Sequence, residues 1–183
     1  AMFLAKYDKF GNLIFAKGKG AYNSFSYGED LALDSEGNIW VTGTFIGATD
    51  FDMGPGENII PGNSQNDIFL AKYDNTGELI FAKAIAGTNY EYAEGLVIDS
   101  DGSALITGRF RGTVDFDPGN GVRELPSFGD FDIFLAKYNS AGDLVFAYQM
   151  GGAGLETGQS LTIDNEGNII ISGTYGDSNA DFD

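Results

Sequence analysis

Apolar residues along the chain come in short runs, each about as long as a β-strand and each followed by a polar break that contains glycine. In the first full group, four runs follow one another, at residues 30–34, 38–45, 67–73 and 78–85. Runs such as NIWVTG and DIFLAKY are almost continuously apolar, which is typical of strands that are covered on both faces. None is long enough for an amphipathic helix, so the pattern predicts an all-β protein of short strands.

The breaks have a common turn chemistry. Those after the first run read DSEGN, DSDGS and DNEGN, and those after the third run read DKFGN, DNTGE and NSAGD. Each places Asp or Asn first and Gly three residues later, which is the pattern of a type I turn followed by a residue at positive φ. We therefore predict antiparallel hairpins, with these turn residues after the first run: Asp34, Asp99, Asp164, Gly37, Gly102 and Gly167.

The runs repeat along the chain with one period. FLAKY begins at Phe3, Phe69 and Phe134, so its starts lie 66 and 65 residues apart. The segments LALDSEGNIWVTGTF, LVIDSDGSALITGRF and LTIDNEGNIIISGTY begin 65 residues apart both times. Four antiparallel strands in each period correspond to one blade of a β-propeller.

We predict about three blades for the chain. Two are complete, at residues 29–86 and 94–150, and two are half blades, at residues 1–20 (third and fourth strands) and 159–183 (first and second strands). A glycine recurs within the second strand of each unit, where it predicts a bulge or a close approach between blades: Gly43, Gly108 and Gly173.

The blade count bears on the partners. Closed propellers have roughly four to eight blades, so three cannot close a ring. The half blades would also leave exposed strand edges that favour pairing. Two outcomes follow: further blades belong to a longer parent chain, or the half blades of two chains complete a six-bladed ring as a homodimer with C₂ symmetry.

Composition narrows the function. The net charge of −17 argues against nucleic acid and against an anionic membrane surface as partners. The chain has neither cysteine nor histidine, which excludes thiolate sites and the usual general base. No apolar run approaches membrane-spanning length, so we expect no membrane insertion.

A pair of aspartates separated by one phenylalanine recurs where the long loop after each second strand begins. An EF-hand would place a glutamate at its twelfth position, but counting from Asp115 that position is Pro126. The carboxylates could still hold Ca²⁺ with nearby carbonyl groups, or cap backbone N–H groups in a turn over a buried phenylalanine. The metal candidates are Asp50, Asp52, Asp115, Asp117, Asp181 and Asp183.

Tyrosines and carboxylates also gather in the loops that lead from one blade into the next. These loops share one face of the predicted propeller with the long loops, and tyrosine beside carboxylate suits a glycan or protein ligand. The alternative is that the tyrosines pack between blades. The candidates are Tyr27, Tyr90, Glu91, Tyr92, Glu94 and Glu156. A carbohydrate-active enzyme with paired carboxylates is a weaker alternative, because nothing singles out two acids among twenty-seven.

The motifs DIFLAKYDNTGELIFAK, LVIDSDGSALITG and GTVDFDPGNGV resemble those of the bacterial SBBP-type β-propeller repeats, over essentially the whole chain. That resemblance implies a secreted or cell-surface protein that acts as a non-catalytic binding module or scaffold, and it brings no catalytic residues. A structural module that assembles with copies of itself is the runner-up function.

Overall fold

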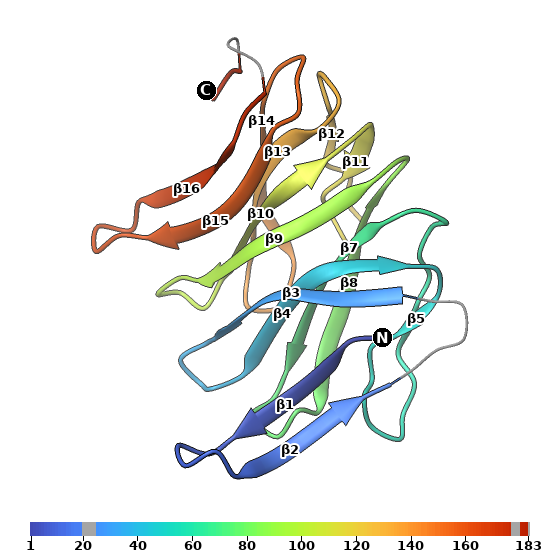
Figure 1. Cartoon of the computed structure of the whole chain (residues 1–183), viewed down its shortest axis with the longest axis vertical. Coiled ribbons are helices and arrows are strands. Elements are labelled where there is room, and N and C mark those ends of the chain that lie inside the picture. The colour runs from blue at the N-terminus through green and yellow to red at the C-terminus, as the bar shows by residue number, and fades with distance from the viewer. Residues whose placement is uncertain (20–24, 177–179, 183) are drawn as a thin grey trace.

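The computed structural model describes residues 1–19, 25–176 and 180–182, and these residues form an all-β structure (Figure 1). The predicted fold class is confirmed: the strands are antiparallel and four strands form the repeating unit, although no sheet among the described residues closes on itself. Among the described residues there is no helix long and apolar enough to cross a membrane.

Two complete four-stranded units form the centre of the molecule, and we call them blade 1 and blade 2; two short strands of a later loop extend the sheet of blade 1 to six strands. Their strands are hydrogen-bonded in chain order, as the hairpin turns predict. Blade 1 consists of β3 (Phe25–Leu33), β4 (Ile39–Ile46), β7 (Asp67–Tyr73) and β8 (Leu79–Gly87). Blade 2 consists of β9 (Glu91–Ile98), β10 (Ala104–Phe110), β13 (Asp132–Tyr138) and β14 (Leu144–Met150).

A two-stranded hairpin lies at each end of this pair of blades (Figure 1). One is β1 (Phe3–Tyr7) with β2 (Leu13–Gly18), and the other is β15 (Thr157–Ile163) with β16 (Ile169–Thr174). Among the described residues β1 pairs only with β2, and β16 pairs only with β15. Within the described residues both outer edges of each hairpin are therefore unpaired. Compared with a complete blade, β1 lacks the second strand beside it and β16 lacks the third.

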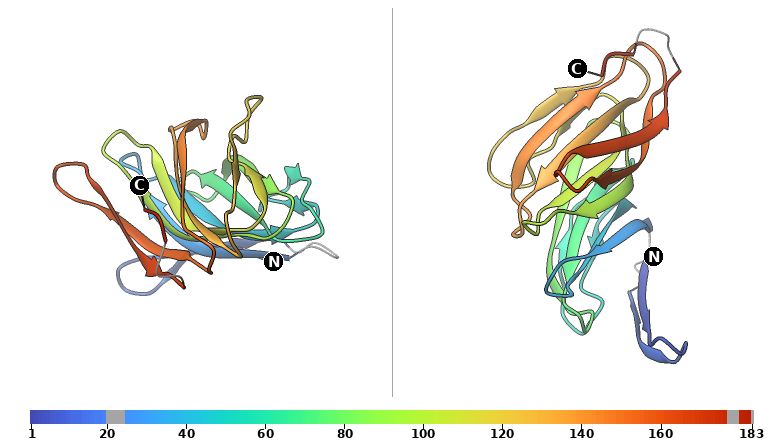
Figure 2. Two further views of the ribbon diagram at one scale, coloured as in Figure 1. Left: turned by 90° about the horizontal axis from the view of Figure 1, so that it is seen from above. Right: turned by 90° about the vertical axis from the view of Figure 1, so that its left-hand side faces the viewer.

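The sheets pack side by side, and the first strand of each unit lies next to the first strand of the neighbouring unit. Thus β9 contacts β3 on one side and β15 on the other (Figure 2). One continuous apolar core joins the blades, with Trp40 and Ile68 of blade 1 packed in the same cluster as Leu96 and Ile106 of blade 2. This burial on both faces explains why the strands read as nearly continuous apolar runs.

The predicted turns form as the sequence indicates. The turn glycines have φ near +80°, for example 81° at Gly37 and 76° at Gly102. The residue at the start of each turn, aspartate in all but the turn that begins at Asn139, caps it. For example, Asp34 Oδ1 accepts hydrogen bonds from the backbone N–H groups of Glu36 and Asn38 at 3.0 and 2.9 Å. These aspartates are therefore structural.

The recurring glycine of the second strand faces a bulge. In blade 2 the pairing of β9 with β10 shifts register between Thr107 and Gly108, and the same shift occurs in β3–β4 and β15–β16. At each of these glycines the backbone of the first strand comes very close. A Cβ atom added to the glycine would lie 1.9 Å from a carbonyl oxygen of that strand; in blade 2 the glycine is Gly108 and the oxygen is that of Tyr92. Of the two predicted causes, the bulge is therefore present at all three glycines.

The long loop of each unit carries a short hairpin: β5 (Thr49–Asp50) with β6 (Ile59–Ile60), and β11 (Thr113–Asp115) with β12 (Glu124–Pro126). The loop of blade 2 reaches back to blade 1, where β11 pairs with β8. An isolated antiparallel bridge between Gly151 and Asp181 repeats this contact one period later. The loop of one unit thus binds to the outermost strand of the preceding unit.

Candidate ligand-binding site

An arginine stacked on aromatic rings lies at the face where β9 begins and where β10 leads into its long loop. Arg109 pairs with Tyr92 across the two strands, and its guanidinium carbon lies 4.7 Å from the centre of the Tyr92 ring. The ring of Phe131, the residue just before β13, has its centre 5.5 Å from the same carbon. The guanidinium therefore has two aromatic neighbours that fix its orientation.

The hydrogen-bonding capacity of this arginine is only partly used. Its Nη1 donates to Thr157 Oγ1 at 3.4 Å, and its Nη2 lies 4.0 Å from Glu94 Oε1, the outer limit of an ion pair. The Nε atom is buried and has no hydrogen-bond partner within the described parts of the chain. A buried donor without an acceptor is costly. The side chain as a whole is 31% exposed, and its weakly engaged Nη atoms are the donors that a bound ligand could use.

The acid beside the arginine is half-buried. Burial raises the pKa of Glu94, the positive charge of Arg109 opposes that shift, and the charge of Glu29 adds to it. Glu29 and Glu94 occupy equivalent positions in the neighbouring strands β3 and β9. The two strands therefore carry acidic side chains on the same surface.

The structure brings Tyr92 and Glu94 of the predicted ligand residues together at this site. Tyr27 in β3 and Tyr90 before β9 are solvent-exposed. Arg109 and Phe131 are additional members that sequence reasoning did not place there. The sequence did contain one indication of the role of Arg109: the equivalent positions in the other two units are both threonine, Thr44 and Thr174, so the arginine departs from the repeat.

The two remaining ligand candidates, Glu91 and Glu156, are completely buried. Glu156 accepts hydrogen bonds from the backbone N–H groups of Gly152 and Gly176 at 3.1 and 3.4 Å, so it orders the loops around it. Burial, followed by the nearby charge of Asp67, raises the pKa of Glu91 to about 8. In the described structure neither side chain reaches the surface on which Tyr92 and Glu94 lie.

The Asp-x-Asp segments are held by hydrogen bonds within their own loop. Asp115 Oδ1 accepts from the backbone N–H groups of Asp117 and Arg123 at 3.0 and 2.8 Å, and Asp117 Oδ1 accepts from that of Gly119 at 2.8 Å. Asp50 and Asp52 accept the equivalent bonds in the first long loop, and Lys19 pairs with Asp50. Asp181 forms the bridge with Gly151, and Asp183 lies outside the described residues.

The intervening phenylalanines are anchors of the same segments. Phe51 and Phe116 are buried, and their carbonyl oxygens accept hydrogen bonds from the hydroxyl groups of Tyr73 and Tyr138 at 3.0 and 2.9 Å. The arrangement is the turn-capping one, with a phenylalanine plug fixed to the third strand of the blade. These hydrogen bonds and the buried phenylalanine give the motif a structural role in both blades, and this role does not require an ion.

Calcium at the Asp-x-Asp segments stays a prediction. Within residues 1–19, 25–176 and 180–182, no three acidic side chains are grouped as a metal site, so an ion would need carbonyl oxygens or water as further ligands. If calcium binds, millimolar Ca²⁺ is expected to raise the melting temperature relative to EDTA, corresponding to about 2.7 kcal/mol at a hundredfold excess over Kd. Asp115→Asn should reduce that rise, and equal melting temperatures in Ca²⁺ and EDTA would exclude the ion.

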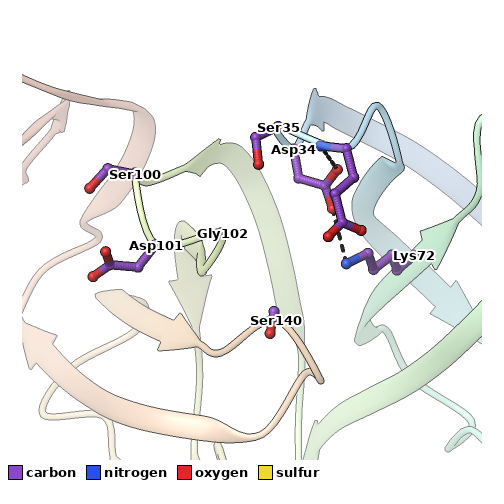
Figure 3. Close-up of a pocket in the computed structure, with 8 residues that line it drawn as sticks. Asp34, Ser35, Lys72, Ser100, Asp101, Gly102 and Ser140 are labelled. Carbon is purple, nitrogen blue, oxygen red and sulfur yellow. Dashed lines mark hydrogen bonds and ion pairs between the residues drawn. The ribbon is translucent and has the colours of Figure 1, made fainter.

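A separate polar cleft of roughly 280 Å³ lies between the turns on the opposite face (Figure 3). Lys72 contacts Asp34 at 3.0 Å and lies over the Trp40 ring at 4.8 Å. Burial alone would raise the pKa of Asp34, but hydrogen bonds from Asn38 and Lys72 outweigh it and hold the pKa well below its usual range. Among the residues that line this cleft, the cationic Lys72 is already paired with Asp34, and the carboxylates of Glu36 and Asp101 leave the cleft acidic, so it is the weaker ligand candidate. Its remaining lining residues are Ser35, Ser100, Gly102 and Ser140.

No family model matches the chain. It is 25% identical over 167 residues, 83% of its length, to the uncharacterized WD repeat-containing protein L264 of Acanthamoeba polyphaga mimivirus. It is also 25% identical over 113 residues, 62% of its length, to the regulatory protein FlaEY of Caulobacter vibrioides. The chain spans only 12% of the length of each of these relatives. WD repeats form propeller blades, so the first similarity agrees with the fold but does not show the SBBP-type family.

Proposed function

We propose that the chain is a non-catalytic, β-propeller-type binding module that acts as a scaffold outside the cell and holds a glycan at the Arg109 site. The observation that carries this proposal is the guanidinium of Arg109, which is oriented by two aromatic rings while its partly exposed Nη atoms make only one long hydrogen bond and one distant ion pair. The similarity to a WD repeat-containing protein supports a propeller-type module. The extracellular location rests on the resemblance to SBBP-type repeats.

The chemistry of the site favours a neutral glycan. Sugar hydroxyl groups both donate and accept, which matches the guanidinium donors of Arg109, the carboxylate acceptor of Glu94 and the hydroxyl of Thr157. Exposed tyrosine rings offer stacking surface for the apolar face of a sugar, and Tyr27 and Tyr90 are exposed on nearby strand ends. The net charge of −17 disfavours strongly acidic ligands.

Replacement of Arg109 by glutamine is expected to weaken glycan binding by roughly 10- to 100-fold, because a hydrogen bond to a charged group contributes about 1.5–3 kcal/mol. A glycan array would identify the bound sugar, and calorimetry would compare its Kd for the wild-type chain and for Arg109→Gln. Arg111→Gln is a matched control, since Arg111 is exposed and paired with Asp130.

Two results would contradict the proposal. One is a wild-type chain that retains no sugar on the array, and the other is an Arg109→Gln variant that binds as tightly as the Arg111→Gln control. If instead a protein ligand is retained and lost with Arg109→Gln, the site is correct and the ligand class is wrong.

A further inference from the structure

Each complete blade encloses a triad of phenylalanines drawn from its second strand, its Asp-x-Asp segment and its third strand. The triad of blade 1 has edge-to-face or tilted ring contacts, with centroids 4.8 to 6.4 Å apart. The triad of blade 2 repeats this geometry at 5.1 to 6.5 Å. All six rings are buried: Phe45, Phe51 and Phe69 in blade 1, and Phe110, Phe116 and Phe134 in blade 2.

The third triad is divided between the two ends of the molecule. The residues equivalent to its second-strand and Asp-x-Asp members are Tyr175 and Phe182, whose rings already make an edge-to-face contact at 6.3 Å. The third-strand member is Phe3, in β1 at the opposite end (Figure 1). Their exposed fractions are 65%, 57% and 75%, whereas their six counterparts are buried. Three large aromatic side chains are thus left in water at positions that the fold otherwise buries.

A groove for the missing ring already exists beside β16. In the complete blades the third-strand phenylalanine packs against the mid-strand glycine, and a Cβ atom on Gly43 would lie 3.0 Å from the Phe69 ring. The equivalent glycine, Gly173, lines an apolar groove of roughly 170 Å³ together with Tyr175 and Phe182. The groove has the lining that a third-strand phenylalanine meets in blades 1 and 2.

The charges are divided in the same way. In blades 1 and 2 the lysine of the third strand pairs with the aspartate of the turn between the first two strands, Lys72 with Asp34 and Lys137 with Asp99, at 3.0 and 2.6 Å. The equivalent lysine of β1 is Lys6, which among the described residues donates to the carbonyl oxygen of Asn75. The equivalent aspartate is Asp164, and no cationic side chain lies within ion-pair distance of it in the described part of the chain.

We propose that β1 of one copy of this chain pairs antiparallel with β16 of a second copy, which completes a blade at each of two symmetric junctions and closes a six-bladed ring. The pairing of β4 with β7 fixes the register: Ile39 opposes Tyr73, and Gly43 opposes Phe69. Transferred to the junction, Ile169 opposes Tyr7, Ala5 opposes Ile171, and Phe3 opposes Gly173. Phe3 then fills the groove beside β16, and Lys6 reaches Asp164. This inference does not depend on the proposed glycan site.

Solution mass is the first test. Light scattering at micromolar concentration and about 0.15 M salt, where repulsion between two chains of charge −17 is largely screened, is expected to give roughly twice the 19.5 kDa mass of one chain. A single-chain mass would overturn the proposal. A ladder of larger masses would overturn the closed ring, because open-ended pairing of copies produces filaments instead of dimers.

Variants test the register. Phe3→Glu is expected to raise the Kd of the dimer by 100-fold or more without loss of the fold, because Phe3 is exposed in the single chain. Lys6→Glu and Asp164→Lys should each weaken the dimer, and the double variant should restore it because both junctions then regain a charge pair. Lys83→Glu is the matched control, since Lys83 pairs with Asp143 on the surface of the blades. A Phe3→Glu dimer as tight as the control, or no rescue in the double variant, would overturn this register.

Discussion

Replacement of Gly108 by alanine is expected to remove a large share of the folding stability of the chain. The new methyl group would lie 1.9 Å from the Tyr92 carbonyl oxygen and 3.0 Å from the Phe134 ring. Overpacking costs about 1–3 kcal/mol where neighbouring side chains can move aside. Here the obstacle is backbone held by the pairing of β9 with β10, so we expect about 4 kcal/mol, a large share of the 5–15 kcal/mol typical of a domain.

Chemical denaturation followed by circular dichroism would measure this loss. Gly102→Ala is a suitable control, because nothing lies within 4 Å of its Cβ position and only the positive φ of 76° opposes the change. We expect that control to cost about 1–2 kcal/mol. If Gly108→Ala costs no more than Gly102→Ala, the bulge can relax and the close approach is not what requires glycine.

The folded chain is expected to lose stability as the pH rises from about 5 to 8. The cause is Glu91, whose side chain is buried beside Asp67 and whose pKa is raised to about 8. The folded state therefore keeps a proton on Glu91 that the unfolded state has already released above pH 4.5. Burial also raises the pKa of Asp67, which acts in the same direction. The loss is at most about 4 kcal/mol, since each pKa unit corresponds to about 1.4 kcal/mol.

Glu91→Gln tests this cause, because the amide keeps the size of the side chain and carries no charge at any pH. Denaturant midpoints between pH 5 and 8 are expected to fall for the wild-type chain and to stay nearly level for Glu91→Gln, which should be the more stable protein at pH 8. Glu124→Gln, at an exposed position, is expected to keep the wild-type slope. A slope that survives Glu91→Gln would assign the pH dependence to other groups.

The parts of this structure that sequence reasoning reached are those encoded by local chemistry. An aspartate followed three residues later by a glycine at positive φ defines each hairpin turn, and the 65-residue period orders the hairpins into sheets. The mid-strand glycines were informative for the same reason, since only a local bulge or a close approach requires glycine in a buried strand.

The parts that it did not reach depend on contacts between units. Tyr-Glu-Tyr at residues 90–92 resembles an exposed polar loop, yet β9 begins at Glu91, and alternation along that strand buries Glu91 and Ala93 while Tyr92 turns toward Arg109. The pairing of β11 with the preceding blade is also invisible in the sequence, because its partner β8 is specified by no local pattern.

That backward contact has a consequence for how such a chain can change its length. The loop of blade 2 pairs with β8, and Asp181 makes the equivalent bridge with Gly151, so these two loops each attach to the unit before them. Tandem duplication of one 65-residue segment would therefore add a unit and the joint that holds it in a single genetic event. The number of units can then vary among descendants of one ancestral segment without a new interface having to arise.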